Sequence, residues 1–162
     1  MYYIKYFFLT SILGFFLESV VWRGHESGIL YGPWTPVYGI GSIIIIFLSD
    51  KILKKKNLNC FIKFVILIFS CILLLSLAEL VGGLLIEKLF CISFWDYSNY
   101  KYNVGKYICL EMSIIWGIAS IIFVVVLRPV MDIIIRKIPD FIVYFVLVLF
   151  LVDLIFTFLF KY

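Results

Sequence analysis

Carboxylate side chains interrupt several long apolar stretches of this sequence. Glu18, Glu79 and Glu111 each lie among apolar residues, and Asp153 is the only charged residue of a long apolar run. A carboxylate near the centre of a membrane helix costs about 2.5–3.5 kcal/mol on insertion scales, so such residues usually line a cavity or pair with another group. We therefore expect Glu18, Glu79 and Glu111 to contribute to a ligand site.

Small residues share a helical face with two of these glutamates. Glu18 follows Ser11 and Gly14 by seven and four residues, and Gly83 follows Glu79 by four. Residues at these spacings lie on one side of a helix, and small side chains allow a second helix to approach closely. The spacing predicts that both glutamates face the interior of a helical bundle.

A purely structural role is the alternative for each acid. Glu87 and Glu111 could be interfacial acids paired with Lys88 and Lys106. Glu18 and Glu79 could be protonated or hydrogen-bonded groups that only lock the packing of their helices.

Two segments between the apolar stretches carry further candidates. The first includes Gly32, Pro33, Pro36, Tyr38 and Gly39. Glycine and proline at these positions predict a fixed turn, and Pro36 is suited to open a helix because its missing N–H is not needed there. We expect these residues to shape the loop.

The second segment runs from Cys91 to Lys106 and contains Trp95, Asp96 and Tyr97. Aromatic residues often anchor membrane interfaces, but an acid between two flat rings can also hold a cation or a polar headgroup. We include these three residues in the predicted ligand cluster.

The sequence predicts no metal site and no cofactor. His25 is the single histidine, and one histidine beside Glu26 is too small a ligand set for a metal. Cys91 and Cys109 bracket the second segment, so a disulfide between them is one alternative and two free thiols the other.

The elements that must position these residues are membrane-spanning helices. The chain has 162 residues, of which 65% are hydrophobic and 15% charged. These values exclude an ordinary soluble domain and a disordered chain, and the lysines form one short tract rather than a nucleic-acid-binding surface. Apolar runs of about 20 residues can cross a bilayer. We predict an all-α polytopic bundle of five spans, namely Tyr3–Trp22, Pro36 to before Lys51, Cys60–Lys88, Tyr107–Leu127 and Asp140–Phe160.

Two details of the spans are less regular. The third span is too long to cross perpendicular to the bilayer, so it must tilt or bend near Gly82 and Gly83. Val130–Ile138, after Pro129, is predicted as a short interfacial helix.

The charged residues predict the orientation of the chain. The tract from Lys51 to Lys56 lies between the second and third spans, and short basic loops face the cytoplasm. Alternation then places the N-terminus inside and the C-terminus outside. On this topology nine of the 14 basic residues lie inside and seven of the ten acids lie toward the outer half.

Several motifs together resemble those of the ABC-transporter type IV family (CmpB-like) of bacterial membrane proteins. They are Leu17-Glu18-Ser19, the segment Leu30–Gly41 with its Tyr-Gly-Pro and Tyr-Gly-x-Gly elements, Trp95-Asp96-Tyr97-Ser98, and Ser113-x-x-Trp116-Gly117. The resemblance covers about 7–129 of a single transmembrane domain, 1–162, and leaves the span 140–160 outside. It implies a multi-pass protein of the bacterial cell membrane with a permease-like role.

Two functions remain open. In the first, the chain is a small permease-like protein whose outward-facing cluster binds a cation or polar solute. Its partners would be the lipid bilayer, a separate ATPase and further membrane subunits in a homo- or hetero-oligomer, with no nucleic acid. In the second, paired carboxylates act as acid and base of a membrane-embedded envelope enzyme on a lipid-linked substrate. The second ranks lower because there is no phosphate-binding P-loop and no nucleophile or zinc motif.

Overall fold

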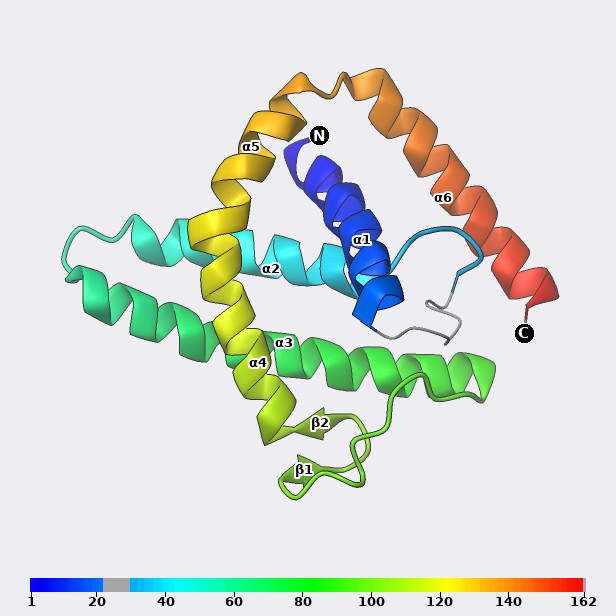
Figure 1. Ribbon diagram of the computed structural model, residues 1–162, viewed down its shortest axis with the longest axis horizontal. Coiled ribbons are helices and arrows are strands. Elements are labelled where there is room, and N and C mark those ends of the chain that lie inside the picture. The colour runs from blue at the N-terminus through cyan, green and yellow to red at the C-terminus, as the bar shows by residue number, and fades with distance from the viewer. Residues whose placement is uncertain (22–29, 162) are drawn as a thin grey trace. The chain divides into compact units, whose positions relative to one another are not determined.

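The computed structural model describes residues 1–21 and 30–161 and is mainly helical (Figure 1). Within these residues five helical segments are long and apolar enough to cross a membrane. They are α1 Tyr2–Val21, α2 Pro36–Leu53, α3 Cys60–Phe90, the run Leu110–Lys137, and α6 Asp140–Phe160. The predicted all-α, five-span membrane fold is therefore confirmed. The predicted end of the first span, at Trp22, lies outside the described residues.

Local chemistry explains where α2 begins and where α3 begins and ends. Pro36 opens α2, as predicted. The Asn59 side chain accepts a hydrogen bond from the Ile62 N–H and so caps the start of α3. At the other end, Cys91 adopts the left-handed conformation that often terminates helices, with a φ of 57°.

The fourth span differs from the prediction at both ends. Tyr107 does not begin a helix, because Ile108–Cys109 forms strand β2, which pairs with β1 Asn103–Val104 in a short antiparallel hairpin. Gly105 turns this hairpin with a φ of 68°, a conformation that favours glycine. The helix α4 begins only at Leu110 and extends to Ile122.

The predicted stop before Pro129 is also wrong. Helical hydrogen bonding continues through a π-helical turn, η1 Phe123–Leu127, into α5 Arg128–Lys137. Proline lacks an N–H and clashes with the carbonyl four residues before it, so an ordinary α-helix is strained there. The wider turn, in which the Arg128 N–H bonds to Phe123 O, accommodates Pro129 without ending the helix. The predicted interfacial helix is thus the continuation of the fourth span.

The chain divides into two compact units. The first comprises Met1–Ile43 and Val130–Tyr162, and the second comprises Ile44–Pro129. In the first unit, Phe8, Leu30, Trp34 and Val143 form a buried apolar cluster. In the second, α3 packs against α4.

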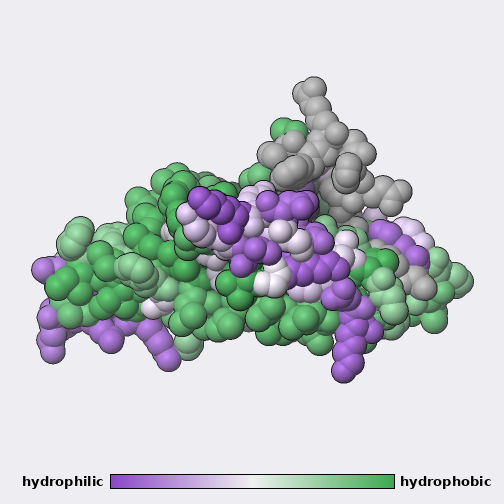
Figure 2. All heavy atoms as spheres, turned by 90° about the horizontal axis from the view of Figure 1, so that it is seen from below, coloured by the Kyte–Doolittle hydropathy of each residue, from purple (hydrophilic) through white to green (hydrophobic). Residues whose placement is uncertain are grey.

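Large apolar side chains remain exposed on the membrane-length helices. Phe61 of α3 and Phe141 of α6 are more than two-thirds exposed, and Figure 2 shows apolar residues over much of the face in view. A water-soluble protein rarely exposes such extended apolar surface, whereas lipid tails solvate it.

Candidate functional site

In the second unit, α3 and α4 are in close contact near Glu79. A Cβ atom on Gly117 of α4 would lie 2.7 Å from Ile72 of α3, so only glycine permits this approach. One turn away, the hydroxyls of Ser76 and Ser113 form a hydrogen bond of 2.7 Å. Small and hydroxylated residues of this kind are typical of helix contacts in membranes.

Glu79 lies at this helix contact and is only 5% exposed. Its Oε1 accepts a hydrogen bond from the Tyr97 hydroxyl at 3.1 Å, and the Trp116 indole interacts with the same carboxylate. Oε2 makes no hydrogen bond of standard geometry in the described part of the chain. None of the ion pairs formed by the described residues involves Glu79. The structure thus places one acidic group among aromatic donors, with no cationic partner in the described chain.

The second loop packs against α3 beside this carboxylate. Trp95 and Tyr107 contact each other edge to face, with ring centroids 5.8 Å apart. Tyr107 packs so tightly on Gly83 that a Cβ there would clash with the ring, and Trp95 lies near Gly82. The expectation that Gly83 admits a second helix is therefore corrected, because its missing side chain admits the Tyr107 ring of the loop instead.

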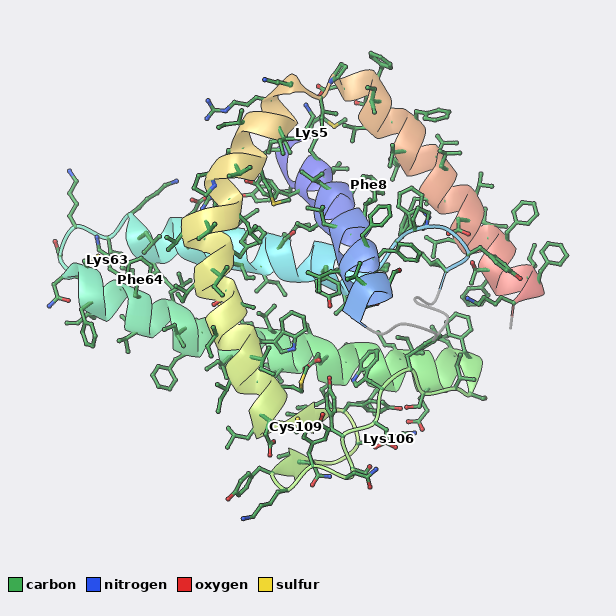
Figure 3. All side chains as sticks on the ribbon, in the orientation of Figure 1. Lys5, Phe8, Lys63, Phe64, Lys106 and Cys109 are labelled. Carbon is green, nitrogen blue, oxygen red and sulfur yellow. The ribbon has the colours of Figure 1, made fainter. Side chains whose placement is uncertain are left out.

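An ion pair fastens the loop to α3. The Lys106 ammonium lies 2.8 Å from Glu87 Oε1, and the Lys106 carbonyl accepts the Tyr97 N–H at 2.8 Å. The hydrogen bond to Glu87 raises the pKa of Lys106. Figure 3 shows Lys106 and Cys109 on the segment that leads into α4. Glu87 therefore forms the ion pair that was the structural alternative for it, with Lys106 as its partner.

Burial keeps the hydroxyl and thiol groups near Glu79 protonated. Desolvation, followed by the Glu79 charge, raises the pKa of Tyr97, so Tyr97 remains a hydrogen-bond donor. Burial also raises the pKa of Cys109, with smaller contributions from Glu111 and Glu79. Cys109 and Cys91 are both free, and the Cys109 sulfur instead accepts the Met112 N–H at the start of α4. The disulfide alternative is not adopted.

Asp96 and Glu111 occupy different positions around this site. Asp96 is exposed, and its Oδ1 accepts the Ser98 N–H at 2.8 Å. The hydrogen bonds from Ser98 lower the pKa of Asp96. Glu111 is half-buried, interacts with Cys109, and has an Oε2 without a hydrogen bond within the described chain. Among the predicted cluster, Tyr97 contacts Glu79 directly, whereas Asp96 shapes a turn.

Glu18 belongs to the first unit, where it interacts with Tyr38 and Thr35. The Tyr38 ring packs so closely on Gly14 that a Cβ there would clash with it, and a Cβ on Gly39 would lie 2.5 Å from the Phe7 ring. The close helix approach predicted from Gly14 is therefore observed on α1.

The remaining loop-shaping residues form a turn held by α6. Gly32 and Pro33 lie in a bend, and the Gly32 N–H donates to Asp153 Oδ2 at 3.0 Å. Sequence reasoning missed this role of Asp153, because 121 residues separate the two partners and no local pattern links them. The sequence marks Trp116 only as part of a motif and does not indicate that its indole interacts with Glu79.

The expectation of no metal site can be compared only with the residues that the structure describes. Within residues 1–21 and 30–161, no group of three histidine, cysteine, aspartate or glutamate side chains is arranged to hold a metal ion. His25 and Glu26 lie outside those residues.

Comparison with known proteins identifies the family. The model of a family described as "Putative ABC-transporter type IV" matches residues 5–159. The chain belongs to this family. The match includes α6, so the expected limit of the resemblance near Pro129 was too short. No curated protein and no solved structure matches the chain. Membership and the five apolar helices make this a membrane protein related to ABC transporters.

Proposed function

We propose that the chain is a permease-like membrane subunit in which Glu79 binds a cationic solute. The observation that carries the proposal is a carboxylate that is 5% exposed, has no ion-pair partner in the described chain, and has one oxygen, Oε2, without a hydrogen bond of standard geometry there. A buried charge of this kind is costly unless it is neutralised. A bound cation would neutralise it.

The surrounding side chains favour an organic cation. Tyr97 and Trp116 interact with Glu79, and Trp95 lies on the loop beside them. Aromatic faces attract ammonium groups, and tryptophan does so most strongly. Tetramethylammonium combines positive charge with an apolar surface and is therefore a suitable probe.

Fluorine NMR of fluorotryptophan-labelled protein in lipid nanodiscs tests this site directly. Addition of tetramethylammonium should shift the Trp116 resonance in a saturable manner. Glu79→Gln should weaken this response at least tenfold, which corresponds to about 1.4 kcal/mol of binding free energy. Sodium chloride added as competitor would show whether the site also accepts an inorganic cation.

A matched control lies two turns along α3. Glu87 is paired with Lys106 and its side chain is 45% exposed, so Glu87→Gln should leave the Trp116 response unchanged. A Trp116 response that survives in Glu79→Gln would contradict the proposal.

A separate ATPase is the partner that the family implies. We infer that it docks on the lysine-rich connection between α2 and α3, which we propose to be cytoplasmic in a bacterial cell membrane. Lys54, Lys55 and Lys56 are exposed there, and Lys63 binds the Leu53 carbonyl at 3.0 Å.

Purification of the tagged chain should recover a P-loop protein with ATP-hydrolysing activity. Glutamine at these three exposed lysines should reduce its recovery, and unchanged recovery would contradict the docking site.

The enzyme alternative has less support. It needs two carboxylates that act together as acid and base, whereas Glu79 is buried and accepts a hydrogen bond from Tyr97, and Asp96 is exposed and accepts one from Ser98.

A further inference from the structure

Two helices of the protein contain nearly the same sequence. Residues 38–44 of α2 read Tyr-Gly-Ile-Gly-Ser-Ile-Ile, and residues 116–122 of α4 read Trp-Gly-Ile-Ala-Ser-Ile-Ile. The two segments have the same residue at five of the seven positions, and the other two replace tyrosine by tryptophan and glycine by alanine. Both segments follow a helix that carries a buried or half-buried glutamate.

The shared glycine contacts the preceding helix at the same register in both pairs. Gly39 packs on Ser11 and Phe7, which precede Glu18 by seven and 11 residues. In the second unit, Gly117 packs on two residues of α3 that precede Glu79 by the same intervals, namely Ile72 and Ile68.

The shared serine repeats this correspondence. The Ser42 hydroxyl lies 3.0 Å from that of Thr10, eight residues before Glu18. Ser120 interacts with Cys71, eight residues before Glu79. Each serine also donates to the carbonyl of its own glycine, Ser42 to Gly39 at 2.8 Å and Ser120 to Gly117 at 2.7 Å.

The shared aromatic residue reaches the carboxylate in both pairs. Tyr38 interacts with Glu18 within the first unit, and Trp116 interacts with Glu79 within the second. The sequence match, the helix register and the carboxylate partner therefore agree. Independent packing of two unrelated helix pairs has no reason to reproduce all three, whereas internal repeats are common in membrane transporters.

We propose that α1–α2 and α3–α4 are two copies of one helix-pair module and that Glu18 forms a second cation site equivalent to that of Glu79. This inference rests on the proposed function for the chemistry of the ligand. The Glu18 site has hydroxyl and aromatic partners in Thr35 and Tyr38. Glu18 is half-buried rather than 5% exposed, so the second site should bind the same class of ligand less tightly.

Binding of radiolabelled tetramethylammonium to the full chain in nanodiscs tests the inference. The wild-type chain should bind two equivalents, Glu18→Gln one, Glu79→Gln one, and the double variant none. Tyr38→Phe and Trp116→Phe form a matched pair that keeps an aromatic ring and removes the polar hydrogen. Each should weaken only the site of its own module, which keeps the test decisive if a glutamine variant fails to fold.

The outcomes separate the two proposals. One equivalent bound by the wild type, lost in Glu79→Gln and unchanged in Glu18→Gln and Tyr38→Phe, would overturn the second site and leave the proposed function standing. No binding by the folded wild-type chain would overturn the proposed function and the second site with it.

Discussion

Single glycines in this protein act mainly by allowing an aromatic ring or a second helix to approach their own helix. Gly83 and Gly82 are adjacent on α3, yet a side chain at the first would meet the Tyr107 ring, whereas a Cβ at the second would lie 3.8 Å from Trp95. Only the first position requires glycine for steric reasons.

Gly83→Ala should therefore lower the free energy of unfolding by about 1–3 kcal/mol, because overpacking forces the buried Tyr107 ring to move. Gly82→Ala is the control and should be neutral or stabilising by up to about 1 kcal/mol through helix propensity. Denaturant unfolding in detergent measures both. Equal effects of the two substitutions would contradict the steric role of Gly83.

Asp96 should make its loop sensitive to acid. Its pKa is lowered by the hydrogen bonds from Ser98, so the stabilisation is present above the ordinary value of 3.8 and is lost as pH falls through the lower pKa of the folded loop. Hydrogen exchange at the Ser98 amide, corrected for its intrinsic pH dependence, should show less protection once the pH falls below the pKa of Asp96 in the folded loop.

Asn retains the turn but does not titrate, so Asp96→Asn should remove the acid sensitivity of the Ser98 amide. The neighbouring Lys106–Glu87 pair is unchanged in this variant. Acid sensitivity that persists in Asp96→Asn would assign it to that pair instead.

At the scale of elements, the π-helical turn before Pro129 is the least regular part of a membrane span. The turn accommodates a missing N–H, and removal of the proline removes the need for it. Pro129→Ala should stabilise the run Leu110–Lys137 by up to about 3 kcal/mol, the difference between proline and alanine inside a helix.

Thermal unfolding of Pro129→Ala and of Val130→Ala measures this difference. Val130 is the next residue and is exposed, so its substitution should change stability little. A destabilised Pro129→Ala chain would mean that the wide turn makes native contacts that an α-helix loses.

At the scale of the whole molecule, the orientation in the membrane follows from the charges of the connections. We predict that the α2–α3 connection faces the cytoplasm and that the segment after α3 faces outward. Two native cysteines test this, because Cys60 and Cys91 lie at opposite ends of α3 and both are exposed, whereas Cys71 and Cys109 are buried.

A membrane-impermeant maleimide added to intact cells should label Cys91 and leave Cys60 unlabelled. Labelling should disappear in Cys91→Ser and persist in Cys60→Ser. Labelling of Cys60 from outside would reverse the proposed orientation.

The amino-acid sequence by itself determined the membrane class, the number of spans and most helix ends. These features depend on local properties, namely the length of apolar runs and helix-starting residues such as Pro36. Helical periodicity also indicated which face Glu79 shares with Gly83. The same reasoning failed at Pro129, because proline usually ends a helix and a π turn has no clear sequence signal.

Only the tertiary structure decided which side chains meet. Tyr97 contacts Glu79 while its neighbour Asp96 is exposed, and Gly32 binds Asp153 across 121 residues. Such contacts depend on which helix faces pack together, which is a property of distant segments and not of local sequence. The repeated motif of α2 and α4 is visible in the residues, but its common register against Glu18 and Glu79 emerges only from the packing of each pair.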